Sequence, residues 1–373
     1  MQNCIIFLNR YDDNTRLWIA TVFDNKDFLA TSRAPLQSLL LGTHLWTIHN
    51  DSIKCARNSI SEPNTVMMTL TGCSHSEFTC SDGNCVSMDA RCDDKLDCAD
   101  ETDEDDCSLI IHNSHYKKEI VPPTINDLSK LRVNVTVDIE NIGKIDVVDG
   151  VIEIMYKLTR TWYDSRLLYQ NLNINNNLNK LSEEDIDNLW FPLFSFKNIA
   201  SPDSYEEAES SRNWTVIRNK SYIHQKADKT ENKNIYLFEG SQNYIECTKL
   251  FSTVFNCEYD LSWYPFDTQV CSMKFEAIAD VEIEAQELAI SGSKKLAQYE
   301  VLAVCMCTTY EHGVKLAEVK IKLSRPLLNN ILTVFIPTVI IVIISHMAKY
   351  FEENYVDMVI QVNLTAILVL ANL

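Results

Sequence analysis

The sequence predicts a multidomain, mainly β chain, in which a β-sandwich follows a small disulfide-rich module and precedes transmembrane α-helices. Six of the thirteen cysteines fall within residues 73–107. Apolar residues alternate with polar ones in many short stretches of residues 121–325, and 23 residues without Lys, Arg, Asp or Glu separate Arg325 from Lys349. Disulfides staple small domains, period-two apolarity is typical of half-solvated strands, and an apolar run of this length spans a bilayer as a helix.

The charge balance excludes one class of function. Asp and Glu number 52 against 33 Lys and Arg, which gives a net charge of −19, whereas nucleic-acid binding requires a basic face. Twelve acidic residues and two basic ones lie within residues 73–107, so more than half of the net charge belongs to that segment. The cysteine count favours an oxidising, extracytoplasmic compartment.

Residues 1–72 carry few motifs and are predicted to be an unassigned β-rich or lectin-like fragment. Cys4 and Cys55 are candidates for a disulfide, and this pairing is left open. The apolar start, CIIFL, is too short for a signal-peptide core, and the chain ends within an apolar run at Leu373. We therefore expect the chain to be truncated at both ends.

Residues 73–107 contain, in order, the patterns F-x-C, D-G-x-C, C-D and D-C-x-D-x-x-D-E. Together with the six cysteines, these patterns resemble the LDL-receptor class A module, and we refer to residues 73–107 as the class A module. Six cysteines alone allow fifteen pairings. The resemblance implies three of them: Cys73–Cys85, Cys80–Cys98 and Cys92–Cys107.

The same resemblance implies a structural Ca²⁺ ion as cofactor. Clustered carboxylates repel one another unless a cation lies among them, and Ca²⁺ prefers six to eight oxygen ligands. The alternative is a solvated acidic loop. Carried over by position, the ligands are the side chains of Asp93, Asp97, Asp103 and Glu104 and the backbone carbonyls of Ala90 and Lys95.

A linker over residues 108–120 leads to residues 121–325, which we predict to form a sandwich of antiparallel strands. KLRVNVTVDIENI, DGVIEIMYKLTRTWY and KLAEVKIKLS are the clearest strands. Ser182 followed by Asp185 predicts the start of a short helix, and the polar stretch of about twenty residues near Asn213 predicts a surface loop. Sequons that suit extracellular exposure begin at Asn50, Asn134, Asn213 and Asn219.

The segment CEYDLSWYPFDTQVC places thirteen residues between Cys257 and Cys271 and contains Tyr264, Pro265, Phe266 and Asp267. It resembles the signature loop of the pentameric Cys-loop receptors, also called neurotransmitter-gated ion channels. WYDSRLLY resembles the W-x-D-x-R-L strand of that family, DNLWFPL its W-x-P-D segment, and KIKLSR its last strand, which ends at Arg325. The resemblance implies an immunoglobulin-like ligand-binding sandwich over residues 121–325 and assembly into homo- or hetero-pentamers.

The resemblance also implies a coupling role for the disulfide loop. In the family this loop lies at the membrane face of the sandwich, where Tyr264, Pro265 and Phe266 would press on transmembrane linkers. Asp267 would pair with Arg325 as a two-state contact. The alternative is that Asp267 only stabilises the turn of the loop.

The agonist is not identified by the sequence. Amine-binding relatives use aromatic residues at positions where this chain has Lys157 and Thr159, and the region expected for the capping loop, VCMCTTYEHG, offers Tyr310. These three residues are the candidate ligand contacts. Acetylcholine-like recognition is disfavoured, which leaves a small acidic ligand, a proton or no agonist. Cys305 and Cys307 lie on one face of a strand and either pair with Cys247 or stay reduced.

Residues 326–373 form the predicted transmembrane region. A first helix is expected over about 327–348, with Pro337 where the first transmembrane helix of the family has its proline, and a truncated second helix over about 358–373. The candidate pore residues are Asp357, Gln361, Thr365 and Leu368. No basic residue lies within residues 355–359, at the start of the second helix, which favours cations.

These patterns predict a plasma-membrane channel subunit with an extracellular N-terminal region, whose partners are other subunits, the lipid bilayer and an unknown small-molecule agonist. One alternative is a binding, adhesion or endocytic receptor that captures ligands through the class A module. Another is a nonconducting accessory subunit. The sequence has no nucleophile–base set, so we predict that the protein is not an enzyme.

Overall fold

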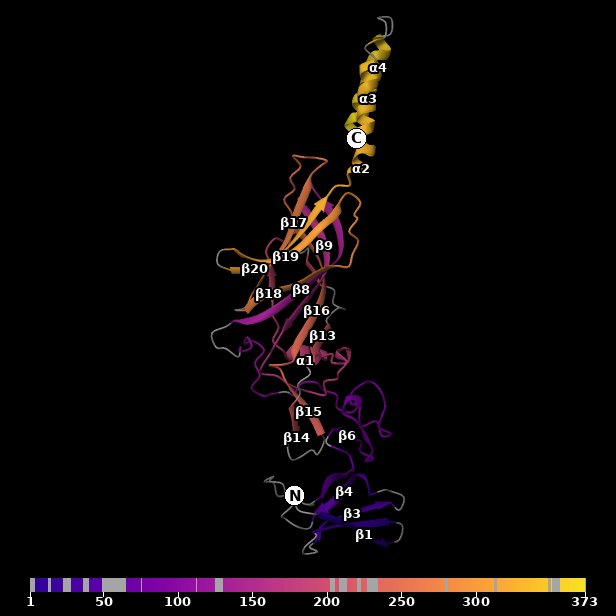
Figure 1. Ribbon diagram of the computed structural model, residues 1–373, viewed down its shortest axis with the longest axis vertical. Coiled ribbons are helices and arrows are strands. Elements are labelled where there is room, and N and C mark those ends of the chain that lie inside the picture. The colour runs from indigo at the N-terminus through magenta and orange to yellow at the C-terminus, as the bar shows by residue number, and fades with distance from the viewer. Residues whose placement is uncertain are drawn as a thin grey trace. The chain divides into compact units, whose positions relative to one another are not determined.

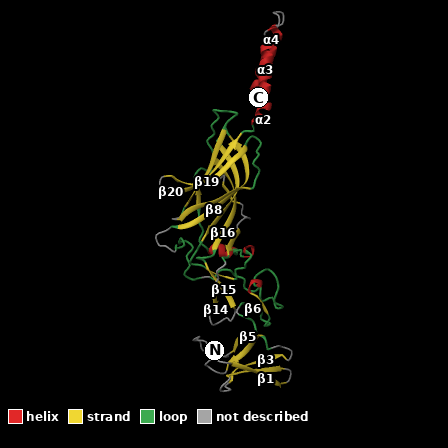
Figure 2. Ribbon diagram, in the orientation of Figure 1, coloured by secondary structure: helices red, strands yellow, loops and turns green. Residues whose placement is uncertain are grey.

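The computed structural model describes residues 4–372 except 13–14, 23–27, 36–39, 49–64, 75, 112, 125–129, 202–204, 208–212, 220–222, 227–233, 279–280, 312–313, 348–349 and 351–355. Two compact units divide the chain. Unit 1 comprises Met1–Ser129, Thr161–Phe191 and Asn213–Cys247, and unit 2 comprises Lys130–Arg160, Pro192–Arg212 and Thr248–Leu373. The elements of each unit are shown in Figures 1 and 2.

Unit 1 begins with a five-stranded antiparallel sheet in which each strand pairs with the next along the chain. Its buried side chains are Trp18, Ala30 and Trp46, with Met68 and Leu70 packed against them. The β-rich part of the prediction for residues 1–72 agrees with this sheet, and the lectin-like part stays a prediction. The strands are β1 (Cys4–Asp12), β2 (Thr15–Val22), β3 (Phe28–Pro35), β4 (Gly42–Ile48) and β5 (Thr65–Leu70).

The class A module has little regular structure. It contains a hairpin of β6 (Glu77–Thr79) and β7 (Cys85–Ser87) and the 3₁₀ turn η2 (Met88–Ala90). Phe78, Cys80 and Cys98 form its small buried core. A core of this size needs covalent support, because it removes little apolar surface from water.

The rest of unit 1 is built around an aromatic cluster. The Trp162 ring packs edge-on against the rings of Trp190, Phe191 and Trp214 at centroid distances of 5.4 to 6.1 Å. Helix α1 begins where predicted, because the Ser182 hydroxyl accepts a hydrogen bond from the Asp185 N–H at 3.1 Å. The elements are β10 (Leu168–Gln170), η3 (Asn176–Leu178), α1 (Glu183–Asn188), β13 (Asn213–Ile217), β14 (Ile223–Lys226) and β15 (Asn234–Glu239).

The prediction of a surface loop near Asn213 is wrong. Residues 213–217 form β13, which pairs with β16 (Tyr244–Asn256), and β14 pairs with β15. Trp214 and Val216 are buried, since every second residue of β13 points into the core. Tertiary burial of two apolar side chains therefore decides the structure of a segment whose composition is mostly polar.

Unit 2 contains the two sheets of the predicted sandwich, drawn in Figure 1 around β8, β9, β17, β19 and β20. One sheet has the order β12-β16-β9-β8-β18 and the other the order β11-β17-β20-β19. Tyr156, Phe196, Phe251, Phe255 and Phe275 pack their rings together between them. The strands are β8 (Leu131–Asp146), β9 (Val151–Trp162), β11 (Phe194–Phe196), β12 (Tyr205–Glu207), β16, β17 (Thr268–Ala277), β18 (Val281–Ile290), β19 (Glu300–Glu311) and β20 (Val314–Ser324).

The alternation of burial follows the sequence pattern. Leu131, Val133, Val135, Val137 and Ile139 are all buried on one face of β8, and the residues between them are half-buried or exposed. The prediction that all strands are antiparallel is wrong at one place, because β18 runs parallel to β8. Parallel neighbours require a long crossover, and here the whole chain from β9 to β17 lies between the two strands.

The C-terminal part of unit 2 is helical, as Figure 2 shows. It consists of α2 (Leu327–Asn330), a π-helical turn η6 (Ile331–Phe335), α3 (Ile336–Met347) and α4 (Val356–Asn372). In the part of the chain that the structure describes, no single helix has both the length and the apolarity needed to span a membrane.

Candidate functional site

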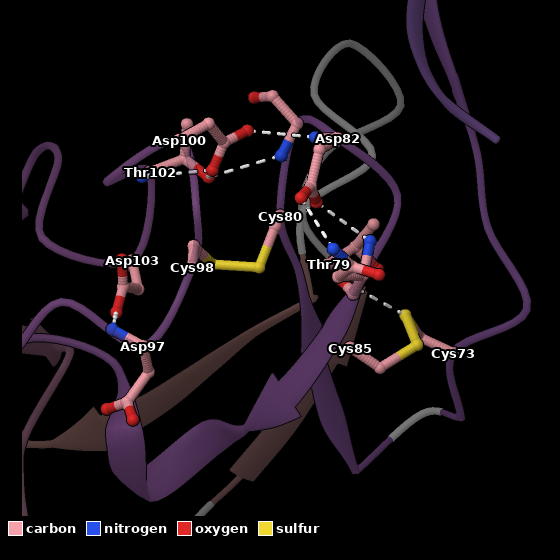
Figure 3. Close-up of a disulfide and its surroundings, with 12 residues drawn as sticks. Cys73, Thr79, Cys80, Asp82, Cys85, Asp97, Cys98, Asp100, Thr102 and Asp103 are labelled. Atoms are coloured by element: carbon pink, nitrogen blue, oxygen red, sulfur yellow. Dashed lines mark hydrogen bonds between the residues drawn. A yellow bond between two sulfur atoms is a disulfide. The ribbon is translucent and has the colours of Figure 1, made fainter. Parts of the chain in front are cut away.

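The class A module contains three disulfides, and they are the three that the resemblance implies. They join Cys73 to Cys85, Cys80 to Cys98 and Cys92 to Cys107, with Cα–Cα distances of 5.4, 5.8 and 5.6 Å. Two of them are drawn in Figure 3. Arg91 is buried, and its guanidinium lies 4.8 Å from the centre of the Phe78 ring. The small core is therefore covered on one side by a cation–π contact.

The candidate calcium ligands belong to one loop of this module. The Asp97 N–H donates to Asp103 Oδ2 at 2.7 Å, which Figure 3 shows, and the Asp93 N–H donates to Glu104 Oε1 at 2.8 Å. Asp103 is fully buried, and its Oδ1 has no hydrogen-bond partner among the described residues. A buried carboxylate oxygen without a partner is costly, so this atom fits a cation.

The fit is to a hard cation such as Ca²⁺. Asp93, Asp97, Asp103 and Glu104 offer oxygen only, and carbonyls of Ala90 and Lys95 would add two more oxygens. Among the described residues, the potential metal-ligand atoms that lie within 4.8 Å of one another belong to Cys80, Cys98 and Asp100, which are not among the candidate calcium ligands. The sulfur atoms of Cys80 and Cys98 form a disulfide, which leaves no thiolate to bind a metal.

The second candidate site is the disulfide loop of unit 2. Cys257 and Cys271 are bonded, with a Cα–Cα distance of 5.2 Å. The ion pair between Asp267 and Arg325 is present: Nε of Arg325 donates to Oδ1 of Asp267 at 2.9 Å, and Asp267 is buried. The loop also exposes aromatic surface, because 76% of Trp263 and 64% of Phe266 are accessible to solvent.

Two tyrosines complete the surroundings of Arg325. Its guanidinium carbon lies 4.5 Å from the centre of the Tyr299 ring and 4.9 Å from that of Tyr264. Nη2 of Arg325 donates to the Tyr299 hydroxyl at 2.5 Å. Burial raises the pKa of Tyr299, so its hydroxyl remains a neutral acceptor.

Sequence reasoning missed Tyr299 and Gln269. Nε2 of Gln269 donates to Oδ2 of Asp267 at 2.5 Å and to the Asp260 carbonyl at 2.8 Å, which fixes the carboxylate within the loop. Gln269 lies inside the loop motif, so its position was available as a signal. Tyr299 precedes β19 by one residue and matches none of the motifs considered, so only the folded structure brings it to Arg325.

The W-x-D-x-R-L segment forms a buried polar centre in unit 1. Asp164 accepts two hydrogen bonds from the Arg166 guanidinium, at 2.8 and 2.6 Å, one from the Arg166 N–H at 3.1 Å and one from the Tyr116 hydroxyl at 2.9 Å. A Cβ atom at Gly240 would lie 2.1 Å from the Asp164 carbonyl oxygen, so this close approach requires glycine. Trp162 is buried.

The candidate ligand contacts are not gathered into one site within the chain. Lys157 forms an ion pair with Glu140, and the Thr159 hydroxyl lies 2.9 Å from that of Thr248. Tyr310, on β19, is 71% exposed. Strands β19 and β20 remain paired as far as Glu311 and Val314, so two residues connect them where the family resemblance predicts a capping loop.

The remaining predicted positions are distributed as follows. Asp357, Gln361, Thr365 and Leu368 all lie on α4, and the Thr365 hydroxyl donates to the Gln361 carbonyl of its own helix at 3.0 Å. Cys247 is buried, and Cys305 and Cys307 form no disulfide in the described chain. Asn134 is half-buried, and Asn213 and Asn219 are exposed. Asn50 and Cys55, and the side chain of Cys4, lie outside the described residues.

The β-sandwich and the disulfide loop together define a receptor-type ligand-binding domain, and comparison with known families agrees. The model of the neurotransmitter-gated ion-channel ligand binding domain matches residues 108–301, just over half of the chain. The chain belongs to this family, whose members are receptors and not enzymes. The model of the low-density lipoprotein receptor domain class A matches residues 71–107.

Three curated relatives are each 24% identical to the chain. They are a serotonin-gated chloride channel of Caenorhabditis elegans, the neuronal acetylcholine receptor subunit alpha-3 of Bos taurus and the gamma-aminobutyric acid receptor subunit pi of Mus musculus. The alignments cover 49%, 53% and 79% of this chain. They span 33%, 35% and 61% of the relatives' lengths, so the chain corresponds to part of each.

Proposed function

We propose that this chain is a subunit of a pentameric ligand-gated ion channel of the plasma membrane, with its N-terminal region extracellular. The observation that carries the proposal is the contact between the disulfide loop and the end of β20. Asp267 of the loop binds Arg325, and Arg325 lies two residues before α2. A displacement of the loop would therefore be transmitted directly to the first residues of the helical region.

The C-terminal helices are proposed to form the start of the pore domain. From Leu327 to Met347 the chain is helical without a break in sequence through α2, η6 and α3. At about 1.5 Å per residue such a run approaches the thickness of a hydrocarbon core, ~30 Å. The Ser345 hydroxyl donates to Asn363 of α4, which joins the two helical segments. Asp357, Gln361, Thr365 and Leu368 of α4 are the proposed pore-lining positions.

Within this proposal the class A module would hold one structural Ca²⁺. Asp93, Asp97, Asp103 and Glu104 and the carbonyls of Ala90 and Lys95 are the residues that would bind it. The ion would neutralise clustered carboxylates and order a loop that has almost no apolar core. The exposed sequons at Asn213 and Asn219, and Asn134, are proposed glycosylation sites.

The test is expression of the full-length protein in oocytes, with current recorded during steps of pH and a panel of small acidic and amine ligands. We expect a ligand- or proton-dependent current that disappears in Cys257→Ser, because opening the disulfide loop removes ~3 kcal/mol of loop constraint. Surface labelling separates a gating defect from a failure to reach the membrane. Absence of current from a surface-expressed wild-type protein, alone and with co-expressed subunits, would contradict the proposal.

One observation favours a second candidate, an accessory subunit that works beside others. Strands β19 and β20 are paired up to Glu311 and Val314, so only two residues between the strands are available to fold over a ligand held by a neighbouring subunit. A hetero-pentamer would overcome this limit, since another subunit would supply the cap and this chain would supply Lys157 and Thr159 from the opposite face. In such an assembly, the two sides of the agonist site would come from two different kinds of subunit.

A further inference from the structure

The class A module is hydrogen-bonded to a surface formed by residues 171–176 and Arg218 of unit 1. Nδ2 of Asn173 donates to the Asp89 carbonyl at 3.0 Å. Nδ2 of Asn171 donates to the Asp106 carbonyl at 3.1 Å and to the Ser108 carbonyl at 3.2 Å. Side-chain amides that satisfy backbone carbonyls at two separate points fix both the position and the orientation of the module.

Arg218 adds a charged contact to the same side of the module. Its Nη1 lies 3.3 Å from Oδ1 of Asp89 and donates to the Leu172 carbonyl at 2.9 Å. The guanidinium carbon lies 5.0 Å from the centre of the Phe238 ring. Only 11% of the Arg218 side chain is exposed, and its contacts with the Leu172 carbonyl and the Phe238 ring, both outside the module, orient it. An exposed ion pair contributes little affinity, but a pre-oriented one fixes the register of the contact.

The receptor side of this surface is held by its own hydrogen bonds. The Asn173 N–H donates to Oδ1 of Asn179 at 2.7 Å, and the Arg218 N–H donates to Oδ1 of Asn176 at 3.0 Å. Asn171 has a φ of 55°, a left-handed conformation that asparagine tolerates better than most residues. The three donor side chains are therefore placed by the receptor domain and not by the module.

The points of contact on the module enclose its calcium loop. Asp89 directly precedes Ala90, and Asp106 follows Glu104 by two residues, so the proposed ligands lie between the two carbonyls that the receptor domain binds. A cation that orders this loop would fix both carbonyls in the positions that Asn171 and Asn173 require.

We infer that Asn171, Asn173 and Arg218 form a docking surface for the calcium-loaded class A module, which couples calcium binding to the order of residues 172–179 and 213–218. The inference rests on the proposed calcium site. The coupling is reciprocal, because a contact that favours the loaded module must also raise its affinity for calcium. The module is thus a calcium-dependent cap on the receptor domain rather than a free tether.

Hydrogen–deuterium exchange on the full chain in detergent, with Ca²⁺ or with EGTA, tests this coupling. In the wild type we expect Ca²⁺ to slow exchange of residues 90–107 and also of residues 172–179. In Arg218→Gln and in Asp89→Asn, calcium should still protect residues 90–107, while its effect on residues 172–179 falls at least about threefold.

The exposed Arg33→Gln is the matched control and should behave as the wild type. The apparent calcium affinity of Arg218→Gln should fall about fivefold.

Two results would overturn the inference, and they are distinguishable. If Ca²⁺ protects residues 90–107 but leaves residues 172–179 unchanged in the wild type, or equally protected in both variants, the module binds calcium without coupling. If Ca²⁺ has no effect on residues 90–107, the proposed calcium site fails and the coupling fails with it.

Discussion

At the scale of single residues, Arg325 combines several kinds of contact in unit 2. It binds one carboxylate, one phenol oxygen and two aromatic faces, and all of these come from segments other than its own strand. A guanidinium can do this because it is planar and carries five donors, whereas a lysine ammonium would satisfy only part of the same surroundings. The carboxylate partner is itself held by Gln269.

The ion pair predicts an outcome for charge reversal. Asp267→Arg and Arg325→Asp should each destabilise the full chain by ~3–5 kcal/mol, because each leaves like charges buried together. The double variant should recover at least about half of that loss in thermal unfolding in detergent. Reversal of the ion pair between the exposed Lys144 and the half-buried Asp146 is the control and should cost less than either reversal at the buried pair. A double variant no better than the single ones would mean that Arg325 acts mainly through the tyrosine rings.

Tyr299→Phe separates the hydroxyl of Tyr299 from its ring. The ring contact with Arg325 is retained and the acceptor for Nη2 is lost, so we expect a loss of ~1.5–3 kcal/mol in the free energy of unfolding. Urea denaturation followed by tryptophan fluorescence measures this quantity. The exposed Tyr310→Phe should change it by less than 0.5 kcal/mol or so. Equal effects of the two substitutions would show that the hydroxyl contact contributes nothing.

At the scale of elements, the two disulfide-bonded segments have different physical needs. The Cys257–Cys271 loop lies on a domain with a large aromatic core. Its disulfide therefore restrains the loop, while the core stabilises the fold of the domain. The class A module has three disulfides and a core of three side chains, so its stability depends on covalent and ionic support.

Removal of calcium should therefore affect the module before the sandwich. Asp103→Asn removes the negative charge of the buried carboxylate, and we expect the full chain to lose calcium-dependent recovery of the Cys92–Cys107 disulfide on refolding. Peptide mapping by mass spectrometry under nonreducing conditions reports the pairing. Asp105→Asn, at an exposed acidic neighbour, should refold like the wild type. Calcium-independent pairing in the wild type would exclude a structural role for the ion.

At the scale of the whole molecule, the excess of acidic charge and the large apolar core belong to different parts of the chain. The acidity of the sequence is concentrated in the class A module, whereas the receptor domain relies on apolar alternation and on two buried polar centres around Asp164 and Asp267. More than half of the net charge of −19 thus belongs to one module, and this charge predicts nothing about the agonist.

The short β19–β20 connection makes a prediction about assembly. If this chain supplies only one half of an agonist site, co-expression with a subunit that has a long capping loop should produce currents larger than either chain gives alone. Substitution of Lys157 by Ala should then shift the half-maximal agonist concentration, because Lys157 lies on the proposed opposite face. A full response from this chain expressed alone would contradict an accessory role.

Much of the fold was predictable because it depends on local patterns. The alternation of apolar and polar residues predicted β8, β9 and β20, and a capping serine predicted the start of α1. The motifs of residues 73–107 and 257–271 indicated the two disulfide-bonded segments. The parallel pairing of β18 with β8 and the strand β13 were not predictable in this way. Both depend on which distant surface a segment is buried against, and sequence periodicity does not contain that information.

The sequence by itself carries the motifs from which the family resemblances imply the cysteine pairs, the acidic loop proposed to bind calcium, and the ion pair between Asp267 and Arg325. These features lie within short motifs or at the ends of recognisable strands. Only the tertiary structure decided that Tyr299 and Tyr264 enclose Arg325 and that Arg218 holds Asp89 of the class A module. Those contacts join residues 26 to 129 positions apart, and such pairs become neighbours only after the chain has buried its core.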